Sequence, residues 1–256
     1  MPAVARSEPF REQACPLGVC DGSGWILGPE DVARPCECRA ARLRKGRGRG
    51  VAAAIPRRYQ GVSFDRPPVA DMARDMTSRF VVEACREYTA HLDDNLDQGR
   101  GLWLMGNTGT GKTSLGMVVA KAALAQGKTV GVYFAPKLLT RIRQTFQETE
   151  SENAYSRFFS KLTALDLLYI DDLGAERRTD WVVEQLYAVI NERYEEQRSM
   201  LITSNAKSDV AEGQQQLEEQ IGSRTVSRLI EICGDPLPLF GPDRRVEARH
   251  SGALGE

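Results

Sequence analysis

The chain has 256 residues, of which 41% are hydrophobic and 27% charged, with a formal net charge of −1. This suits one globular domain of ordinary size with a smaller attachment, and the near-zero charge by itself identifies no partner. No stretch approaches the roughly 20 apolar residues that span a bilayer, and no apolar leader follows the first charges, so we expect a cytoplasmic protein with no membrane partner. In that reducing compartment, the six cysteines suit metal ligands or buried thiols better than disulfides.

Four cysteines lie in two close pairs within the first forty residues. Two close pairs separated by a short loop can deliver four thiolates to a tetrahedral Zn²⁺, and a segment with so little apolar surface would gain its stability from the metal. Neither pair has the commoner two-residue spacing, so a tail with incidental cysteines is the alternative. We expect residues 1–38 to form a small zinc-binding segment with the ligands Cys15, Cys20, Cys36 and Cys38.

Residues 39–50 are basic and interrupted by glycines, which favours a flexible linker. Such a tether could contact the phosphates of a nucleic acid, or it could be a solvated linker without a partner. We expect the main domain at residues 51–245 and a C-terminal tail at 246–256.

The main domain opens with a helical pattern that ends near Gly99. Apolar residues recur at every fourth position, which predicts one long helix with a core-facing stripe. His91 within this helix is expected at the surface. The stripe consists of Met72, Met76, Phe80, Ala84, Tyr88, Leu92 and Leu96.

Residues 106–113 read GNTGTGKT and match the phosphate-binding pattern G-x-x-x-x-G-K-[ST] at every fixed position. The glycines let backbone N–H groups surround the α- and β-phosphates, the lysine faces the β- and γ-phosphates, and the threonine hydroxyl can hold Mg²⁺. An apolar strand-like run precedes the loop and helix formers follow it, as this motif requires. We assign nucleotide binding to Gly106, Asn107, Thr108, Gly109, Thr110, Gly111, Lys112, Thr113 and Ser114, with Thr113 also on the metal.

Strands and helices alternate beyond this loop. We expect strands at 129–134, 165–170 and 199–203, and helices at 136–146, 153–162 and 181–196. This order predicts an α/β fold with a parallel sheet covered by helices on both faces.

Two adjacent carboxylates, Asp171 and Asp172, follow the strand expected at 165–170. This is the position of a Walker B acid, so we expect Asp171 to hold Mg²⁺ and Asp172 to polarise the attacking water. The metal would offset the repulsion between the two carboxylates.

A basic and aromatic group precedes these acids in the chain. Basic side chains suit the backbone of a nucleic acid and rings suit its bases, so the group is a candidate surface for single-stranded DNA. Core packing of the phenylalanines is the alternative. The group consists of Lys137, Arg141, Arg143, Arg157 and Lys161 with Tyr155 and Phe158.

Residues 167–205, together with 53–65, resemble the DnaC/DnaI/IstB group of AAA+ ATPases, and the resemblance extends over about 51–245. It implies an AAA+ P-loop domain that hydrolyses ATP with Mg²⁺ and self-associates. It also implies that Asn205 senses the γ-phosphate, that Arg228 is an arginine finger for a neighbouring subunit, and that Arg245 is a second sensor. The implied catalytic set is therefore Lys112, Asp171, Asp172, Asn205 and Arg228.

Two branches of this group are candidates. DnaC and DnaI carry a small N-terminal domain, zinc-binding in the DnaI branch, and load the replicative hexameric helicase onto single-stranded DNA, whereas IstB-type proteins help a transposase. The cysteines favour the helicase-loader branch over the IstB branch, with a zinc segment that binds the helicase. Asp172 stands where many AAA+ ATPases have Glu, which suits slow, switch-like hydrolysis. A small-molecule kinase would need a second substrate pocket and a lid, and a zinc-finger adaptor with an inactive ATPase is disfavoured because no motif residue is missing.

Overall fold

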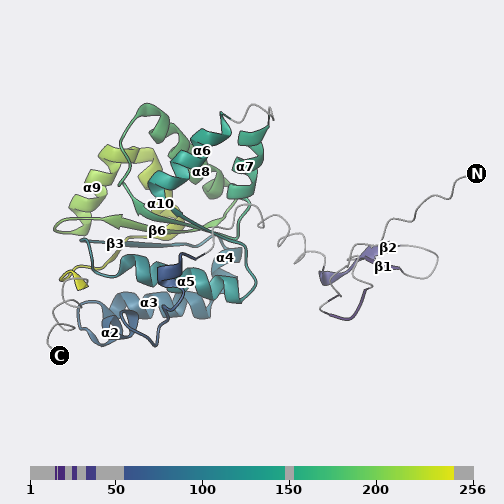
Figure 1. Cartoon of the computed structure of the whole chain (residues 1–256), viewed down its shortest axis with the longest axis horizontal. Helices are drawn as coiled ribbons and strands as arrows, with labels where there is room; N and C mark the ends of the chain where they lie inside the picture. Colours follow the sequence, from purple (N-terminus) through teal and green to yellow (C-terminus); the bar gives the residue numbers. More distant parts are fainter. Residues whose placement is uncertain are drawn as a thin grey trace, which may run out of the picture. The chain divides into compact units, whose positions relative to one another are not determined.

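The computed structural model describes residues 15, 17–20, 25–27, 33–38, 55–147 and 153–244. The chain divides into two compact units, Met1–Arg47 and Gly48–Glu256, and Figure 1 shows the elements of each. The linker expected at 39–50 and the tail expected at 246–256 lie outside the described residues.

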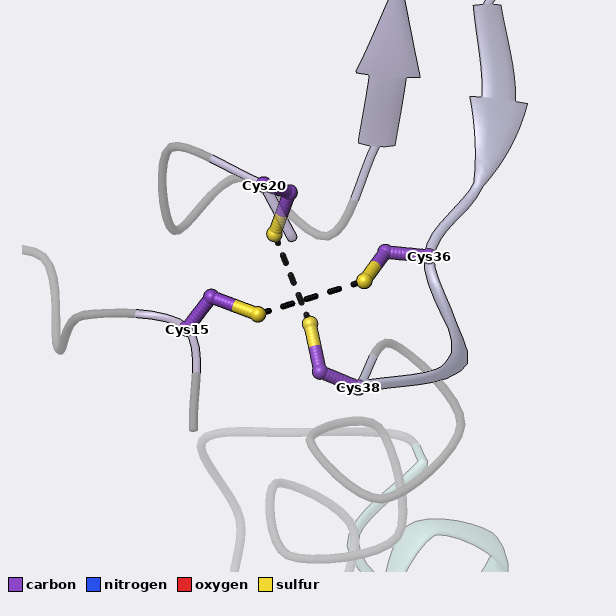
Figure 2. Close-up of side chains that lie close together, drawn as sticks. All are labelled: Cys15, Cys20, Cys36 and Cys38. Atoms are coloured by element: carbon purple, nitrogen blue, oxygen red, sulfur yellow. Dashed lines mark hydrogen bonds between the residues drawn. The ribbon is translucent and has the colours of Figure 1, made fainter. Parts of the chain in front are cut away.

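The smaller unit contains a two-stranded antiparallel sheet. Strand β1 (Trp25–Leu27) pairs with strand β2 (Ala33–Pro35), with Ile26 opposite Arg34. Cys36 follows β2 directly, and Figure 2 shows its side chain pointing toward those of the other three paired cysteines. The hairpin therefore positions the second cysteine pair.

The larger unit is built on a five-stranded sheet in the order β4-β5-β6-β3-β7, and every pairing in it is parallel. In a parallel sheet the carboxyl ends of the strands meet at one edge. Here the register places Gly106 opposite Asn205 and Phe134 opposite Asp171. The strands are β3 (Leu102–Gly106), β4 (Val130–Phe134), β5 (Leu167–Leu173), β6 (Ser199–Asn205) and β7 (Leu237–Pro238).

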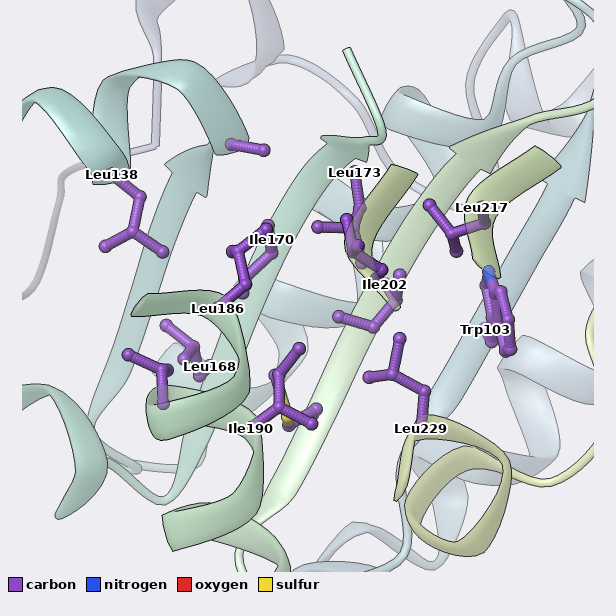
Figure 3. Packing of buried hydrophobic residues seen from close by; sticks show 14 of the residues in the cluster. Trp103, Leu138, Leu168, Ile170, Leu173, Leu186, Ile190, Ile202, Leu217 and Leu229 are labelled. Atoms are coloured by element: carbon purple, nitrogen blue, oxygen red, sulfur yellow. The ribbon is translucent and has the colours of Figure 1, made fainter. Parts of the chain in front are cut away.

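Alternate residues of the buried strands supply two apolar clusters, because successive side chains of a strand point to opposite faces. Trp103, Ile170 and Ile202 belong to the cluster shown in Figure 3, whereas Leu104 and Tyr169 belong to the other. One face is covered by α6 (Ala135–Thr145), α7 (Ala154–Thr163), α8 (Asp180–Glu195), α9 (Val210–Ile221) and α10 (Ser223–Cys233). The opposite face carries α2 (Val69–Arg74), α3 (Arg79–Ala90), α4 (Leu92–Asp97) and α5 (Lys112–Ala125). The predicted parallel sheet covered on both faces is confirmed.

Local capping explains where two of these helices begin. The Thr179 hydroxyl accepts the Val182 N–H at 3.2 Å at the start of α8, and the Asp209 carboxylate accepts the Glu212 N–H at 2.9 Å at the start of α9. Each side chain satisfies a backbone donor that has no partner within the helix.

The single long helix expected up to Gly99 is wrong, because the chain forms α2, α3 and α4 instead. The Asp75 carboxylate accepts the Thr77 N–H at 2.9 Å and the Thr77 hydroxyl at 2.7 Å, and such local bonds compete with helix continuation. The break changes the faces of the helices, so Met76 and Phe80 are 77% and 64% exposed and do not belong to the core. The remaining positions of the stripe are buried or partly buried, and His91 is exposed as expected.

No helix in the described ranges is long and apolar enough to cross a membrane.

Candidate nucleotide-binding and zinc sites

The phosphate-binding loop connects the buried strand β3 to the start of α5. Gly109 and Gly111 have φ values of 83° and 104°, a left-handed region that glycine enters without steric penalty. A Cβ atom on Gly111 would also lie 2.6 Å from the Met72 sulfur. The loop geometry and the packing of α2 against it therefore both require glycine at this position.

The lysine of the motif is held over the loop. Lys112 is 6% exposed, and its Nζ donates to the carbonyl oxygens of Gly106 at 2.8 Å and Asn107 at 2.7 Å. The Thr110 hydroxyl donates to the same Asn107 carbonyl at 3.0 Å. These bonds place the ammonium group beside the N-terminus of α5, where backbone N–H groups favour an anion.

The C-terminal segment at residues 241–244 is hydrogen-bonded to the phosphate-binding loop. The Asn107 side chain donates to the Gly241 carbonyl at 2.8 Å and accepts the Gly241 N–H at 3.1 Å. The Arg244 N–H donates to the Gly109 carbonyl at 3.1 Å. The Asn107 side chain and the Gly109 carbonyl are therefore both bonded to this segment.

Asp171 is held by two hydroxyl groups at the end of the apolar part of β5. Its Oδ1 accepts the Tyr169 hydroxyl and the Thr203 hydroxyl, both at 2.7 Å. Burial raises the pKa of Tyr169 well above its usual range, so its hydroxyl keeps the proton that it donates. No role was predicted for Tyr169 or Thr203 from the sequence. The pattern that could have indicated them is a hydroxyl-bearing residue within an otherwise apolar strand.

Asp172 adopts a left-handed backbone conformation, with φ of 59°. Aspartate tolerates this region better than most residues, and such outliers cluster at functional sites. The Asp172 N–H donates to the Thr203 hydroxyl at 2.8 Å, and Asn205 Nδ2 donates to Asp172 Oδ1. A single hydroxyl thus connects the two acids, and the expected sensor contacts the expected water-activating carboxylate.

A pocket of about 830 Å³ lies in front of these groups. One side carries the phosphate loop and the start of α5, with Asp172 and Asn205 beside them; Asp171 does not line it. The segment before α2 contributes Arg58 together with the apolar and aromatic residues Tyr59, Val62, Pro67 and Pro68. The lining residues are Arg58, Tyr59, Val62, Pro67, Pro68, Asp71, Thr108, Gly109, Gly111, Lys112, Thr113, Ser114, Asp172, Thr203, Asn205 and Arg244.

Arg244 is a lining residue that sequence reasoning missed, and Arg245, the expected second sensor, lies outside the described residues. The Arg244 guanidinium donates to the Asp75 carboxylate at 2.6 Å and the Ser78 hydroxyl at 3.1 Å. The hydrogen bonds from Thr77, with Arg244 contributing, lower the pKa of Asp75. This ion pair fixes the cation at the edge of the pocket.

The expected arginine finger lies away from this pocket. Arg228 on α10 pairs with Glu231 at 3.0 Å, and its guanidinium lies 4.0 Å from the centre of the Tyr194 ring. It lines a second, polar hollow of about 550 Å³ together with Tyr187, Ser223, Arg224 and Ser227. The finger role itself stays a prediction.

The candidate surface for single-stranded DNA lies on α6 and α7, and its five cations are exposed. Tyr155 and Phe158 are partly buried against the core cluster, as the core-packing alternative expects. The exposed Phe146 ring stacks on Tyr155 with 4.5 Å between centroids. Arg143 lies 4.7 Å from the centre of the Trp181 ring. Cations and accessible rings therefore lie together on this part of the fold.

The four paired cysteines come together in the smaller unit (Figure 2). All four sulfur atoms lie within 4.8 Å of one another, with the Cys15–Cys36 and Cys20–Cys38 pairs at 4.0 and 3.5 Å. Zn–S bonds of about 2.3 Å in a tetrahedron require sulfur separations of about 3.8 Å, so the donor set fits Zn²⁺. The Cys20 N–H is the main group that lowers the pKa of Cys15, to about 6, whereas burial is the main cause that raises the pKa of Cys38.

One family matches this chain over residues 85–234, more than half of its length, and its description is "IstB-like ATP binding protein". The phage-like element PBSX protein XkdC of Bacillus subtilis (strain 168) is 29% identical over 230 residues, which cover 86% of this chain and 80% of XkdC. The replicative helicase loader DnaI of the same strain is 22% identical over 192 residues. That match covers 72% of this chain but 58% of DnaI, so the chain spans less than two thirds of that relative.

A solved structure shares the fold. The crystal structure of the DnaC helicase loader matches with a TM-score of 0.61 at 24% identity, over 73% of this chain and 99% of that chain.

Proposed function

This chain belongs to the family of IstB-like ATP binding proteins, and we propose that it uses ATP to load a replicative hexameric helicase onto single-stranded DNA. The resemblance to the DnaC/DnaI/IstB group and the expected AAA+ P-loop fold are confirmed. One observation carries the proposal: a pocket lined by the phosphate-binding motif, Asp172 and Asn205 occurs in a chain that is similar to proteins named helicase loaders.

The first step of this function is ATP binding. In the proposed complex, the loop N–H groups and Lys112 would contact the phosphates, and the Thr113 hydroxyl, which lines the pocket, would be an oxygen ligand of the type that Mg²⁺ prefers. Asp171, which does not line the pocket, would hold the magnesium shell. When bound, Mg²⁺ neutralises charge that develops on the phosphates. The apolar side of the pocket, with Tyr59, Val62 and Pro67, then remains for the base and ribose.

The second step is slow hydrolysis. Asp172 lines the pocket and contacts Asn205, so this pair would orient the attacking water and accept its proton. The backbone conformation of Asp172 and its N–H bond to Thr203 fix where the short carboxylate points. We propose that hydrolysis releases the loader rather than drives movement.

Arg228 would complete the active site of a neighbouring subunit. It lines its own polar hollow and is absent from the lining of its own chain's nucleotide pocket, which supports action in trans through self-association. A finger supplied in this way neutralises charge in the transition state.

Single-stranded DNA would contact α6 and α7. Five exposed cations there can bind phosphates, and the exposed Phe146 ring can stack on a base. The smaller unit would bind the helicase, because a zinc-stabilised hairpin offers a rigid surface in a segment with little core of its own.

The test is a loading assay with the replicative helicase from the same source on circular single-stranded DNA. We expect helicase retained on the circle only with this chain and ATP, and not with Lys112→Ala. A matched control is Lys207→Ala, which removes an exposed lysine that does not line the pocket. Equal loading without this chain, or failure to bind the helicase, would refute the function. Equal affinity for duplex and single-stranded DNA, with stimulation of a transposase, would favour the IstB-type alternative.

A further inference from the structure

One lysine outside the pocket lining holds a turn that contributes to that lining. Lys121 lies on α5, and its Nζ donates to the carbonyl oxygens of Gln60 at 2.6 Å and Val62 at 2.5 Å. Both carbonyls belong to the turn that follows the short helix η2 (Arg57–Tyr59). Hydrogen bonds from a charged donor are stronger than bonds between neutral groups, so this contact fixes the turn.

Helix η2 and this turn both contribute to the pocket lining. Arg58, Tyr59 and Val62 all line it, and the Arg58 guanidinium lies 4.9 Å from the centre of the Tyr59 ring. Val62 is 7% exposed and belongs to the apolar cluster that includes residues of α5. Lys121 itself does not line the pocket. Its effect on a ligand must therefore pass through the turn.

Helix α5 carries both the lysine of the phosphate-binding loop and the lysine that binds the turn. Helix α5 begins at Lys112, and Lys121 lies nine residues farther along, about 13 Å at the rise of an α-helix. A packed helix is rigid over this length. The distance between the phosphate loop and the turn is therefore set by α5 through Lys121.

Phe64, two residues beyond Val62, is held by a different side chain. Arg86 on α3 donates to the Phe64 carbonyl at 3.1 Å, and its guanidinium lies 4.7 Å from the centre of the Phe64 ring. Loss of Lys121 would therefore loosen residues 60–62 while Arg86 still holds residue 64. A local change of this kind affects the turn rather than the whole fold.

We propose that Lys121 is a positioning residue for the nucleoside part of the nucleotide, because it fixes the turn that follows Tyr59 at a set distance from the phosphate loop. The inference rests on the ATP binding proposed above. It predicts that Lys121 matters for a ligand with a base and ribose and not for a ligand made of phosphates alone.

The test compares MgATP with magnesium tripolyphosphate by isothermal titration calorimetry on the full chain. In Lys121→Met, the Kd for MgATP should rise about tenfold, in line with the loss of charge-assisted hydrogen bonds, whereas the Kd for tripolyphosphate stays within about twofold. Lys121→Arg keeps a charged donor and should restore most of the ATP affinity. Lys121→Gln, which keeps length and a neutral donor, should be intermediate and serves if Lys121→Met does not fold.

Two control variants separate the outcomes. Lys112→Ala should weaken both ligands, and Lys128→Met, beyond the C-terminal end of α5 where the lysine pairs with Asp93, should weaken neither. Unchanged ATP affinity in the Lys121 variants, or an equal loss for ATP and tripolyphosphate, would overturn the inference while the proposed function stands. Absence of MgATP binding by the unmodified chain would refute the proposed function and this inference with it.

Discussion

Replacing Thr203 with valine tests whether one hydroxyl organises both acids of the site. Valine has nearly the same shape but removes the 2.7 Å bond to Asp171 and leaves the Asp172 N–H without its 2.8 Å acceptor. Thr203 is 1% exposed, so water cannot easily replace these bonds. A bond to a charged group contributes about 1.5–3 kcal/mol and a neutral one about 0.5–1.5 kcal/mol, so we expect a loss of about 2–4.5 kcal/mol in the free energy of unfolding.

The assay combines thermal unfolding, ATP titration and steady-state hydrolysis. For a domain of this size the expected loss corresponds to a decrease in Tm of about 4–18 °C. The phosphate loop is unchanged, so ATP affinity should stay within about threefold, whereas displacement of the carboxylates should lower kcat by about 10- to 100-fold. Thr203→Ser keeps the hydroxyl and is the matched control. Hydrolysis by Thr203→Val at the unmodified rate, or equal impairment of Thr203→Ser, would refute the reasoning.

Elemental analysis of protein purified without added metal should give about one zinc per chain, held by Cys15, Cys20, Cys36 and Cys38; metal-free protein with an ordered hairpin would contradict this. Binding of single-stranded DNA should weaken with salt, and Arg143→Gln should make the log–log salt slope shallower by about 0.7 for one lost phosphate contact, whereas Arg74→Gln on the opposite face of the sheet should leave the slope unchanged. Arg228→Ala should spare ATP affinity but lower hydrolysis by roughly 10³-fold or more if the finger acts in trans. Mixing Arg228→Ala with Lys112→Ala subunits should then restore part of the ATP hydrolysis. If mixtures shown to co-assemble recover no hydrolysis, the finger role is refuted and Arg228 is only a basic surface residue.

The parts of the site that could be predicted from the sequence are those that follow one another along the chain. The phosphate loop is a run of consecutive residues whose backbone conformation is set by its own glycines, such as Gly109 and Gly111. The two acids follow the apolar part of β5 directly, so their place near its carboxyl end follows from the strand itself. The alternation of strands and helices was sufficient to predict the parallel sheet.

Periodicity failed where a local side-chain bond competed with it. The stripe through Met76 and Phe80 has helical spacing, but the bonds from Thr77 to the Asp75 carboxylate end α2 and shift the faces of the next helix. Spacing alone contains no information on such a bond. The two residues are therefore exposed although their pattern predicts a core.

Only the tertiary structure decides the contacts between segments that lie far apart in the chain. Arg244 pairs with Asp75 across 169 positions, and Lys121 reaches the turn at Gln60 from 61 positions away. Thr203 connects both acids only because β5 and β6 are neighbours in the sheet. A sequence pattern reports which side chains share a face of one element. The partner of that face depends on how the elements pack, because the hydrogen bonds and burial that fix these residues exist only after the sheet has assembled.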